Sequence, residues 1–431
     1  MGAAFEVIRD PLWDNVTLDP GAVRLLDTPA LQRLRYVRQL GHAFLVYPGA
    51  THSRFEHALG AFHLTQRALA ALESRGELEA VAPHDRRAVV LAALLHDIGH
   101  YPFSHALEEA GFPSHEAQGA ARLVEPGLRQ GLEEEGGPGL AAEIGALIRG
   151  RSESPLQGLI SGTLDLDKID YLCRDSRMCG VPYGTVDVDR LLASLTVVEG
   201  RDGGARREIG VQEKGASALE SLLFAKYQMY RNVYWHHAVR SATCMFKRAA
   251  RAAVRRGSFT AAGIAELTDD AFMQLLVAQD PTPLSASVRT RRLHKRALDL
   301  PASEVTADPE PWISEDPDLS ERVEDALAAE AGLAGGELLL DFPARSDMLA
   351  VDLPLRLRDG SVERLTGEGR AGHLGLPRIA AELYRSARRL RVFVARPPAA
   401  PLDGVAALLE MPAAEVSERL DSGAPLLPRV P

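Results

Sequence analysis

An adjacent histidine and aspartate end an apolar segment in the first quarter of this chain. The segment from Val89 to Leu95 is typical of a buried helix, and His96 and Asp97 follow it directly. Burying such a pair is costly unless hydrogen bonds or an ion compensate it, and a metal ion is the usual compensation. For a lone dipeptide the alternative is a hydrogen-bonded pair in the core. Histidines and carboxylates elsewhere in the chain favour the metal.

Four segments place histidines or carboxylates in otherwise apolar helices. They contain His57; His96 and Asp97; His100, His105, His115 and Glu116; and Asp165, Asp167 and Asp170. Two imidazoles with two carboxylates suit Mn, Fe, Zn or Ni, whereas oxygen ligands alone suit Mg or Ca. Such a site keeps open positions at which water is activated near neutral pH. Because Arg54, Lys168 and Arg231 can bind phosphate oxygens, these residues together indicate a phosphohydrolase.

Helical periodicity dominates the chain up to about residue 300. A helix is expected from Asp27 or Thr28, with Pro29 in its first turn, to its end at Gly41. Further helices are expected to begin near residue 53 and to cover 89–95, 114–130, 139–149, 164–173, 215–253 and much of 257–300, with a short strand at 206–214.

The pattern changes in the last quarter of the chain. Strands are expected at 337–342, 353–358, 362–365 and 390–395, and a helix at 378–388. Residues 301–320, rich in Pro, Asp and Glu, predict a linker. The sequence therefore predicts a mainly α fold in three parts: a helical core at 1–255, a helical extension and linker at 256–325, and a small α+β domain with a Pro-rich tail at 326–431.

Composition narrows the class of protein. Of the 431 residues, 46% are hydrophobic and 25% charged, as in ordinary globular proteins. No apolar run is long enough for a membrane span, and no signal peptide is recognisable. Cys173, Cys179 and Cys244 lack metal-ligand spacing and fit a reducing cytoplasm. The net charge of −10 argues against nucleic acid as a partner.

Four motifs resemble a known family. They are Asp27-Thr28-Pro29 with Gln32-Arg33-Leu34-Arg35-Tyr36, the run from Pro48 to His57, the run from His96 to His105, and the run from Asp165 to Tyr171. The chain resembles the HD superfamily of metal-dependent phosphohydrolases, and within it the deoxynucleoside triphosphate triphosphohydrolases. The resemblance is strong over residues 5–255 and extends more loosely to Ala395. It implies a helical HD-domain core and a role in deoxynucleotide metabolism.

The resemblance implies hydrolysis of a dNTP at the α-phosphorus to deoxynucleoside and inorganic triphosphate. It assigns a divalent metal (Mn, Fe, Ni, Zn or Mg, with a transition metal favoured) to His57, His96, Asp97 and Asp167. Asp165 and Asp170 compete with Asp167 on residue type alone. His115, oriented by Glu116, is the expected proton donor, because the pKa of histidine lies near working pH. His100 and His105 are expected to line the site.

Substrate contacts follow from the same resemblance. It assigns Arg54, Lys168 and Arg231 to the triphosphate, and Gln39, Tyr171 and Asp175 to the deoxyribose. Val239 stands where the family has a tyrosine near the sugar. Tyr227, Tyr230 and Tyr234 are expected to pack within their helix, and His236 and His237 to face solvent or phosphate. A structural salt bridge is the alternative role for Arg231.

Regulated members of this family carry a second nucleotide site between subunits. Residues matching that site are Asp27, Gln32, Arg35, Arg291 and Lys295. This match implies an activator nucleotide and a homo-oligomer, either a tetramer or a dimer, whereas a solvated basic surface is the alternative. Trp13-Asp14 replaces the family's usual His-Gly in the same regulatory region.

Two other classes of function share these residues. An HD phosphodiesterase or nuclease acting on single-stranded nucleic acid or a signalling nucleotide would use the same metal site. A non-catalytic nucleotide sensor would need neither the metal ligands nor a proton donor. We therefore expect a cytoplasmic metal-dependent dNTP triphosphohydrolase and keep these two classes as alternatives.

Overall fold

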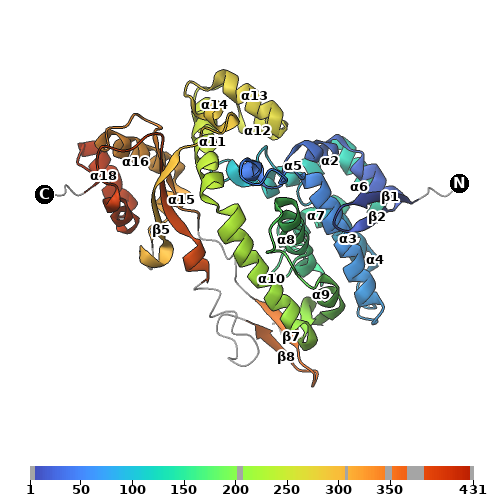
Figure 1. Ribbon diagram of the computed structural model, residues 1–431. Helices are drawn as coiled ribbons and strands as arrows, with labels where there is room; N and C mark the ends of the chain where they lie inside the picture. Colours follow the sequence, from blue (N-terminus) through green and yellow to red (C-terminus); the bar gives the residue numbers. More distant parts are fainter. Residues whose placement is uncertain (1–4, 201–206, 306–308, 345–351, 366–382, 428–431) are drawn as a thin grey trace.

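The computed structural model describes residues 5–200, 207–305, 309–344, 352–365 and 383–427. Helices dominate it (Figure 1), which confirms the expected mainly α fold. Up to residue 255 the elements are β1 (Glu6–Asp10), β2 (Asp14–Leu18), α1 (Pro20–Leu26), α2 (Pro29–Arg33), η1 (Leu34–Tyr36), η2 (Gly41–Leu45), α3 (Arg54–Glu73), α4 (Pro83–Leu95), η3 (Ser104–Ala106), α5 (His115–Leu123), α6 (Pro126–Gly136), α7 (Leu140–Ile148), η4 (Gln157–Leu159), α8 (Leu166–Cys179), α9 (Val188–Ser194), β3 (Leu195–Glu199), β4 (Arg207–Gln212), η5 (Glu213–Gly215), α10 (Ala216–Met229), the π-helical turn η6 (Tyr230–Tyr234) and α11 (His237–Arg255).

The remaining elements lie beyond α11. They are α12 (Ala261–Ala265), α13 (Asp269–Gln279), α14 (Leu284–Arg289), β5 (Lys295–Pro301), η7 (Ala302–Glu304), α15 (Trp312–Glu315), α16 (Pro317–Glu330), β6 (Leu338–Asp341), β7 (Leu353–Arg356), β8 (Val362–Leu365), β9 (Arg389–Val394), η8 (Asp403–Glu410) and α18 (Ala413–Ser422). No helix in these described ranges is both long enough and apolar enough to cross a membrane.

Helix α3 is the centre of the N-terminal core. It begins with a capping box, in which Ser53 accepts from the backbone of Glu56 and the Glu56 carboxylate accepts from the backbone of Ser53. It packs against α4 on one side and α8 on the other. Gly60 permits the close approach of α8, since a Cβ there would collide with Asp170 and Arg174. The large apolar core around these helices includes Phe55, Leu59, Phe62, Leu91, Leu94 and Ile169.

Within the described residues, the strands form sheets of order β1-β2, β3-β4-β7-β8 and β5-β9-β6. The expected boundary at residue 326 does not separate them. Strand β7 pairs in parallel with β4, opposing Leu355 to Val211, and Leu353, Leu355 and Leu365 belong to the N-terminal core. Strand β5 precedes that boundary and pairs with β9. In Figure 1 β7 and β8 lie beside α10, apart from the sheet that contains β5.

Several expected boundaries are wrong, because long-range pairing and proline override local periodicity. The α-helix ends at Arg33, a 3-10 turn follows at Leu34–Tyr36, and the chain is extended from Val37, so that Arg38 pairs with Ser53. Pro126 lacks an N–H and begins a new helix within 114–130. The expected helix at 215–253 is interrupted at residues 230–236, and residues 295–300 are strand because β9 supplies a partner.

The C-terminal third also differs from expectation. The expected linker contains α15 and the start of α16, whose first turn Asp316 caps. The tail contains η8 and α18. The expected strands at 337–342, 353–358, 362–365 and 390–395 correspond to β6, β7, β8 and β9. Residues 383–387 of the expected helix at 378–388 are helical; residues 378–382, and 428–431 of the tail, lie outside the described residues.

Candidate metal and catalytic site

The residues expected as metal ligands converge at the junction of α3, α4 and α8. His57 Nε2 lies 2.7 Å from Asp167 Oδ1 and 3.1 Å from His96 Nε2. His96 Nε2 lies 3.4 Å from Asp97 Oδ1 and 3.4 Å from Asp167 Oδ1. His57 and Asp97 are fully or almost fully buried, whereas Asp167 is about one third exposed. The cluster is therefore buried except at Asp167, where it is open to solvent.

This donor set fits a divalent metal. Ligand atoms about 2.0–2.2 Å from a tetrahedral ion lie roughly 3.3–3.6 Å apart, close to the separations in the cluster. Burial lowers the pKa of His57, but hydrogen bonds to Asp167 and Asp170 outweigh burial and raise that pKa to about 10. Because Nδ1 of His57 donates to Asp170 and Nδ1 of His96 donates to the backbone oxygen of Ala93, the two neutral rings would turn lone pairs toward each other at Nε2, and a cation would relieve this repulsion. Both observations indicate a cluster built around a cation.

The three competing aspartates of α8 have different partners. Asp167 joins both imidazoles of the cluster. Asp165 caps α8 through the backbone N–H of Lys168 and also pairs with the Lys168 ammonium. Asp170 Oδ2 lies 2.7 Å from His57 Nδ1, on the side of the ring away from the cluster. Asp167 therefore faces the same point as the two imidazoles, as a ligand would, whereas Asp170 contacts the far side of the His57 ring.

A buried chain of contacts supports Asp170. Arg174 donates to both of its carboxylate oxygens at 2.9 Å, and donates also to Asp10 Oδ2 at 2.8 Å. The indole N–H of Trp13 donates to Asp170 Oδ1. The β1–β2 hairpin, expected to belong to a regulatory region, thus contacts the groups that orient His57. Sequence reasoning missed this contact because Trp13 and Asp170 are 157 residues apart.

The expected catalytic histidines form a second cluster, and its carboxylate is not the expected one. His100, His105 and His115 surround Glu108, with His115 Nδ1 2.9 Å from Glu108 Oε1. Glu116, the expected orienting residue, is exposed in the first turn of α5. Glu108 contacts His115 instead. Glu108 lies three residues after His105, on the turn that packs against the start of α5. Its position three residues after His105 was the sequence signal that could have identified it.

The second cluster packs closely against the first. His100 Nε2 lies 3.1 Å from Asp97 Oδ1, and its ring stacks on His115 with centroids 3.9 Å apart. Gly99 permits this arrangement, since a Cβ there would collide with the backbone of His115 and Gly119. Burial and the nearby Arg54 hold the pKa of His100 well below its usual range. Burial alone would raise the pKa of Glu108, but hydrogen bonds from His105 and His115 outweigh burial and lower that pKa.

Arg54 links the metal cluster to a cavity of about 400 Å³. Its Nη1 lies 2.6 Å from Asp97 Oδ2, and its Nε donates to Ser104 Oγ at 2.9 Å. The expected substrate residues Gln39, Arg54, Tyr171 and Asp175 line this cavity, together with His105, Tyr234 and Val239. The cavity therefore adjoins both clusters.

Polar groups in the wall of this cavity suit a hydroxylated ligand. Asp175 accepts from the Tyr234 hydroxyl at 2.7 Å and lies 2.7 Å from His52 Nε2. Tyr234, expected only to pack within its helix, is thus part of the cavity wall. Gln39 Oε1 is buried without a hydrogen-bond partner in the described ranges. A carboxylate and a free amide oxygen can accept hydrogen bonds from sugar hydroxyls.

Two expected phosphate ligands lie outside the lining of this cavity in the described part of the chain. Lys168 is paired with Asp165 near the start of α8. Arg231 is exposed in η6 and donates to the Tyr227 hydroxyl at 2.7 Å. In the same region His236 caps α11 through the backbone N–H of Ala238. Lys168 and Arg231 therefore need a side-chain rearrangement before they can contact a phosphate in the cavity.

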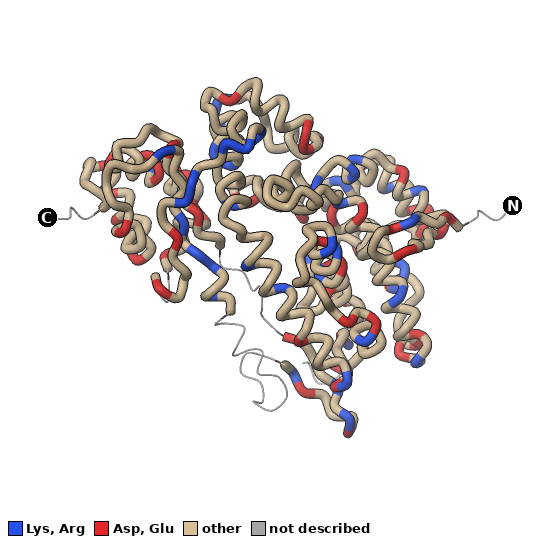
Figure 2. The backbone as a smooth tube through the Cα atoms, viewed as in Figure 1, with Lys and Arg blue, Asp and Glu red and all other residues tan. Residues whose placement is uncertain are grey.

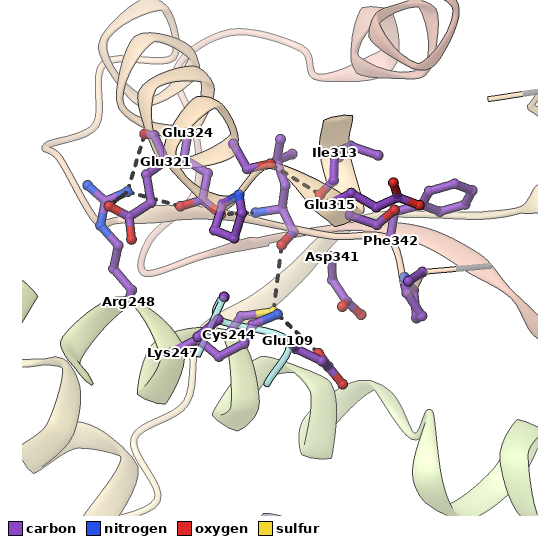
Figure 3. A pocket seen from close by; sticks show the side chains of 18 of the residues that line it. Glu109, Cys244, Lys247, Arg248, Ile313, Glu315, Glu321, Glu324, Asp341 and Phe342 are labelled. Carbon is purple, nitrogen blue, oxygen red and sulfur yellow. Dashed lines mark hydrogen bonds and ion pairs between the residues drawn. The ribbon is translucent and has the colours of Figure 1, made fainter. Parts of the chain in front are cut away.

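A second cavity, of about 450 Å³, lies between α11, α15, α16 and β6 (Figure 3). Its cations are already paired: Lys247 lies 3.1 Å from Glu109, and Arg248 lies 3.1 Å from Glu324. Arg240 and Glu109 line both cavities. The paired charges make this cavity a poor site for an anion.

The five residues expected to bind an activator lie in two places. Arg35 stacks over Phe55 and donates to Gln32 Oε1 at 2.8 Å, close to Asp27 at the end of α1. Arg291 donates to the backbone oxygen of Leu45 at 2.6 Å, and Lys295 begins β5. Figure 2 shows basic residues between α14 and β5. No hydrogen bond or ion pair joins the two groups within the described residues of this chain.

Two family models match consecutive parts of the chain, and the first covers both clusters. The HD domain matches residues 54–175, and the HD associated region matches residues 186–366. The first range contains every residue of both clusters, from His57 to Asp167.

Curated relatives extend the similarity beyond these ranges. An uncharacterised protein of Methanocaldococcus jannaschii is 35% identical over 294 residues, which are 68% of this chain and 59% of that protein. The deoxynucleoside triphosphate triphosphohydrolase SAMHD1 of Homo sapiens is 28% identical over 402 residues, 81% of this chain and 62% of that protein. The chain thus spans less than two thirds of the length of these relatives.

Solved structures share the architecture. A hypothetical protein of Aquifex aeolicus, 26% identical, has a TM-score of 0.70 and covers 91% of this chain and 97% of its own. A phosphohydrolase of Bacteroides thetaiotaomicron, 24% identical, has the same fold with a TM-score of 0.69. The match covers 91% of this chain and 100% of that protein. The chain therefore belongs to the HD superfamily of metal-dependent phosphohydrolases and is similar to its deoxynucleoside triphosphate triphosphohydrolases.

Proposed function

We propose that this protein is a metal-dependent dNTP triphosphohydrolase. The observation that carries the proposal is the adjacency of three features: the cluster of His57, His96, Asp97 and Asp167, the histidines around Glu108, and a cavity of about 400 Å³. The similarity to SAMHD1 over 81% of the chain supports a dNTP as substrate. The products would be a deoxynucleoside and inorganic triphosphate.

His57, His96, Asp97 and Asp167 would hold a divalent ion, which would supply Lewis-acid activation when bound. Water adds to the α-phosphorus as the bond from that phosphorus to the 5′ oxygen breaks. His115 gives a proton to the departing 5′ oxygen and regains one from the attacking water. Glu108 holds the His115 ring in position by accepting a hydrogen bond from its Nδ1. Arg54, which contacts Asp97 and lines the cavity, would bind the phosphate oxygens.

The far wall of the cavity would hold the nucleoside. Tyr171 provides a flat surface for the sugar, and Asp175 can accept from its 3′ hydroxyl while bonded to His52 and Tyr234. The buried Gln39 oxygen is a further acceptor. Val239 lines the cavity where the family has a larger tyrosine. The extra volume could admit the 2′ hydroxyl of a ribonucleotide, so ribonucleotides are included in the substrate test.

We further propose that an activator nucleotide binds between subunits of a homo-oligomer, either a tetramer or a dimer. Support comes from the contacts of the two groups: Arg35 donates to Gln32, whereas Arg291 donates to the backbone of Leu45, and no hydrogen bond or ion pair joins the groups within the described residues. The proposed site would combine one group from each of two subunits. Basic side chains near Arg291 suit a triphosphate.

A nucleotide panel tests these proposals. Purified protein with Mn²⁺ is incubated with each dNTP and rNTP, singly and in pairs, and products are identified by chromatography. We expect triphosphate and deoxynucleoside, and the His96→Ala/Asp97→Ala variant should lose both metal and turnover. Turnover only in pairs would support the activator site. Absence of turnover in every mixture would contradict the proposal. Release of monophosphates, or shortening of a single-stranded oligonucleotide incubated in parallel, would favour an HD phosphodiesterase or nuclease.

A further inference from the structure

Three imidazoles converge on one carboxylate oxygen beside the HD cluster. Glu108 Oε1 lies 2.9 Å from His115 Nδ1, 3.5 Å from His105 Nδ1 and 3.8 Å from His100 Nδ1. One ligating atom from each of the four residues lies within 4.8 Å of the others. Such a convergence of nitrogen donors exceeds what orienting a single proton donor requires.

These separations match those around a bound transition metal. Ligand atoms about 2.0–2.1 Å from a tetrahedral ion lie roughly 3.3–3.4 Å apart, within the range that the cluster spans. The rings of His105 and His115 are inclined by 79°, with centroids 5.3 Å apart. Two imidazoles so inclined can direct their in-plane lone pairs at one ion, with the Glu108 carboxylate as the third ligand.

His100 has a different place in this cluster. Its ring lies almost parallel to that of His115, inclined by 11°, so both planes cannot contain the same ion. Its Nδ1 is buried and lacks a hydrogen-bond partner in the described part of the chain, although it faces Glu108. It can accept a hydrogen bond from a water that completes the shell of an ion. The unpartnered nitrogen is a second observation pointing to a ligand here.

We propose that His105, Glu108 and His115 form a second divalent-metal site, selective for transition metals such as Zn²⁺ or Co²⁺. Two imidazoles and one carboxylate favour these ions over Mg²⁺ or Ca²⁺. The site is accessible, because the His105 side chain is 58% exposed and Glu108 and His115 are about one fifth exposed. Its ligands are separate from those of the HD cluster, and the His100 ring lies between the two sites.

Occupancy of this site would oppose proton donation by His115. An ion on Nδ1 replaces the proton that Glu108 now orients, so the ring cannot carry the two protons of an imidazolium. This consequence rests on the proposed function. Excess Zn²⁺ is therefore expected to inhibit turnover by the Mn²⁺-loaded protein.

Metal counting tests the site without reference to turnover. The chelator-stripped full chain is titrated with Co²⁺, followed by visible absorption and by native mass spectrometry. We expect two equivalents for the wild type and one for His105→Ala, a change at an exposed side chain. The His96→Ala/Asp167→Ala variant should keep one equivalent, and His84→Ala, outside both clusters, should keep two.

Other counts would overturn the second site. A wild type that binds one equivalent, or a His105→Ala variant that still binds two, contradicts it. Glu108→Gln repeats the test with a near-isosteric change, and circular dichroism confirms that each variant is folded. If no dNTP is hydrolysed, the proposed function fails, whereas the metal counts remain decisive for the second site.

Discussion

At the scale of single residues, the orientation of His57 depends on a carboxylate that does not face the metal position. Asp170 accepts from the far nitrogen of the ring and is itself held by Arg174. Partners of this kind fix the tautomer and direction of a ligating imidazole. Sequence spacing alone could not distinguish this role from ligation.

Replacing Asp170 by Asn should therefore weaken metal binding without removing a ligand. Loss of the charge behind His57 is expected to lower affinity for Mn²⁺ about 10- to 100-fold. Calorimetric titration of the stripped protein measures it. Asp165→Asn on the same helix is the matched control, because Asn also caps helices and Asp165 does not contact His57. Equal affinities for the two variants would rule out the orienting role.

At the scale of elements, α16 is joined to β6 through a buried carboxylate. Glu324 accepts from the backbone N–H of Leu340 at 2.8 Å and lies 3.1 Å from Arg248 on α11. Burial raises the pKa of Glu324 to about 7, although Arg248 opposes this shift. The carboxyl therefore holds its proton in the folded state over a range where the unfolded chain has lost it.

This raised pKa predicts a pH dependence of stability. Between about pH 4.5 and 7 the folded protein binds more protons at Glu324 than the unfolded chain, so this group lowers the free energy of unfolding as pH rises. Glu324→Gln keeps an acceptor for Leu340 but does not ionise. Urea denaturation at pH 5 and pH 8 should show the variant gaining stability relative to wild type at the higher pH. A constant difference would contradict the raised pKa.

At the scale of the whole molecule, one buried arginine connects three parts of the fold. Arg240 on α11 donates to both oxygens of Glu109, beside the His105–Glu108 turn, and to Asp341 at the end of β6. In Figure 1 α10 and α11 run between the helices of the HD core and the sheet of β5, β9 and β6. The Arg240 contacts therefore join that sheet to the turn that carries the second cluster.

Asp341→Asn should destabilise the folded protein strongly. Removing one partner of a buried ion pair costs about 3–5 kcal/mol. Arg240 would keep Glu109, but both Arg240 and the buried Arg391 would lose the Asp341 carboxylate. Asp421→Asn removes the partner of Arg322 in an exposed pair and should cost only about 0–1 kcal/mol. Urea denaturation of both variants measures the contrast. Similar losses in the two variants would show that the Arg240 contacts do not join the sheet to the core.

The sequence by itself determined the mainly α class and the metal-ligand candidates. The helices carrying His57, His96 and Asp167 have local signals: the capping box at Ser53, the apolar run before His96, and Asp165 as N-cap. The later strands were also predictable, because their short apolar segments are bounded by turn residues. These features depend on residues close together in the chain.

Only the tertiary structure decided which residues act as partners. Glu108 rather than Glu116 contacts His115, because the turn after Gly99 folds back against the start of α5. Strand β7 joins β4 rather than β6, and Trp13 reaches Asp170, because strand pairing and side-chain contacts join segments far apart in the chain. Spacing constrains neighbours on one helix, whereas contacts between segments depend on how the whole chain packs.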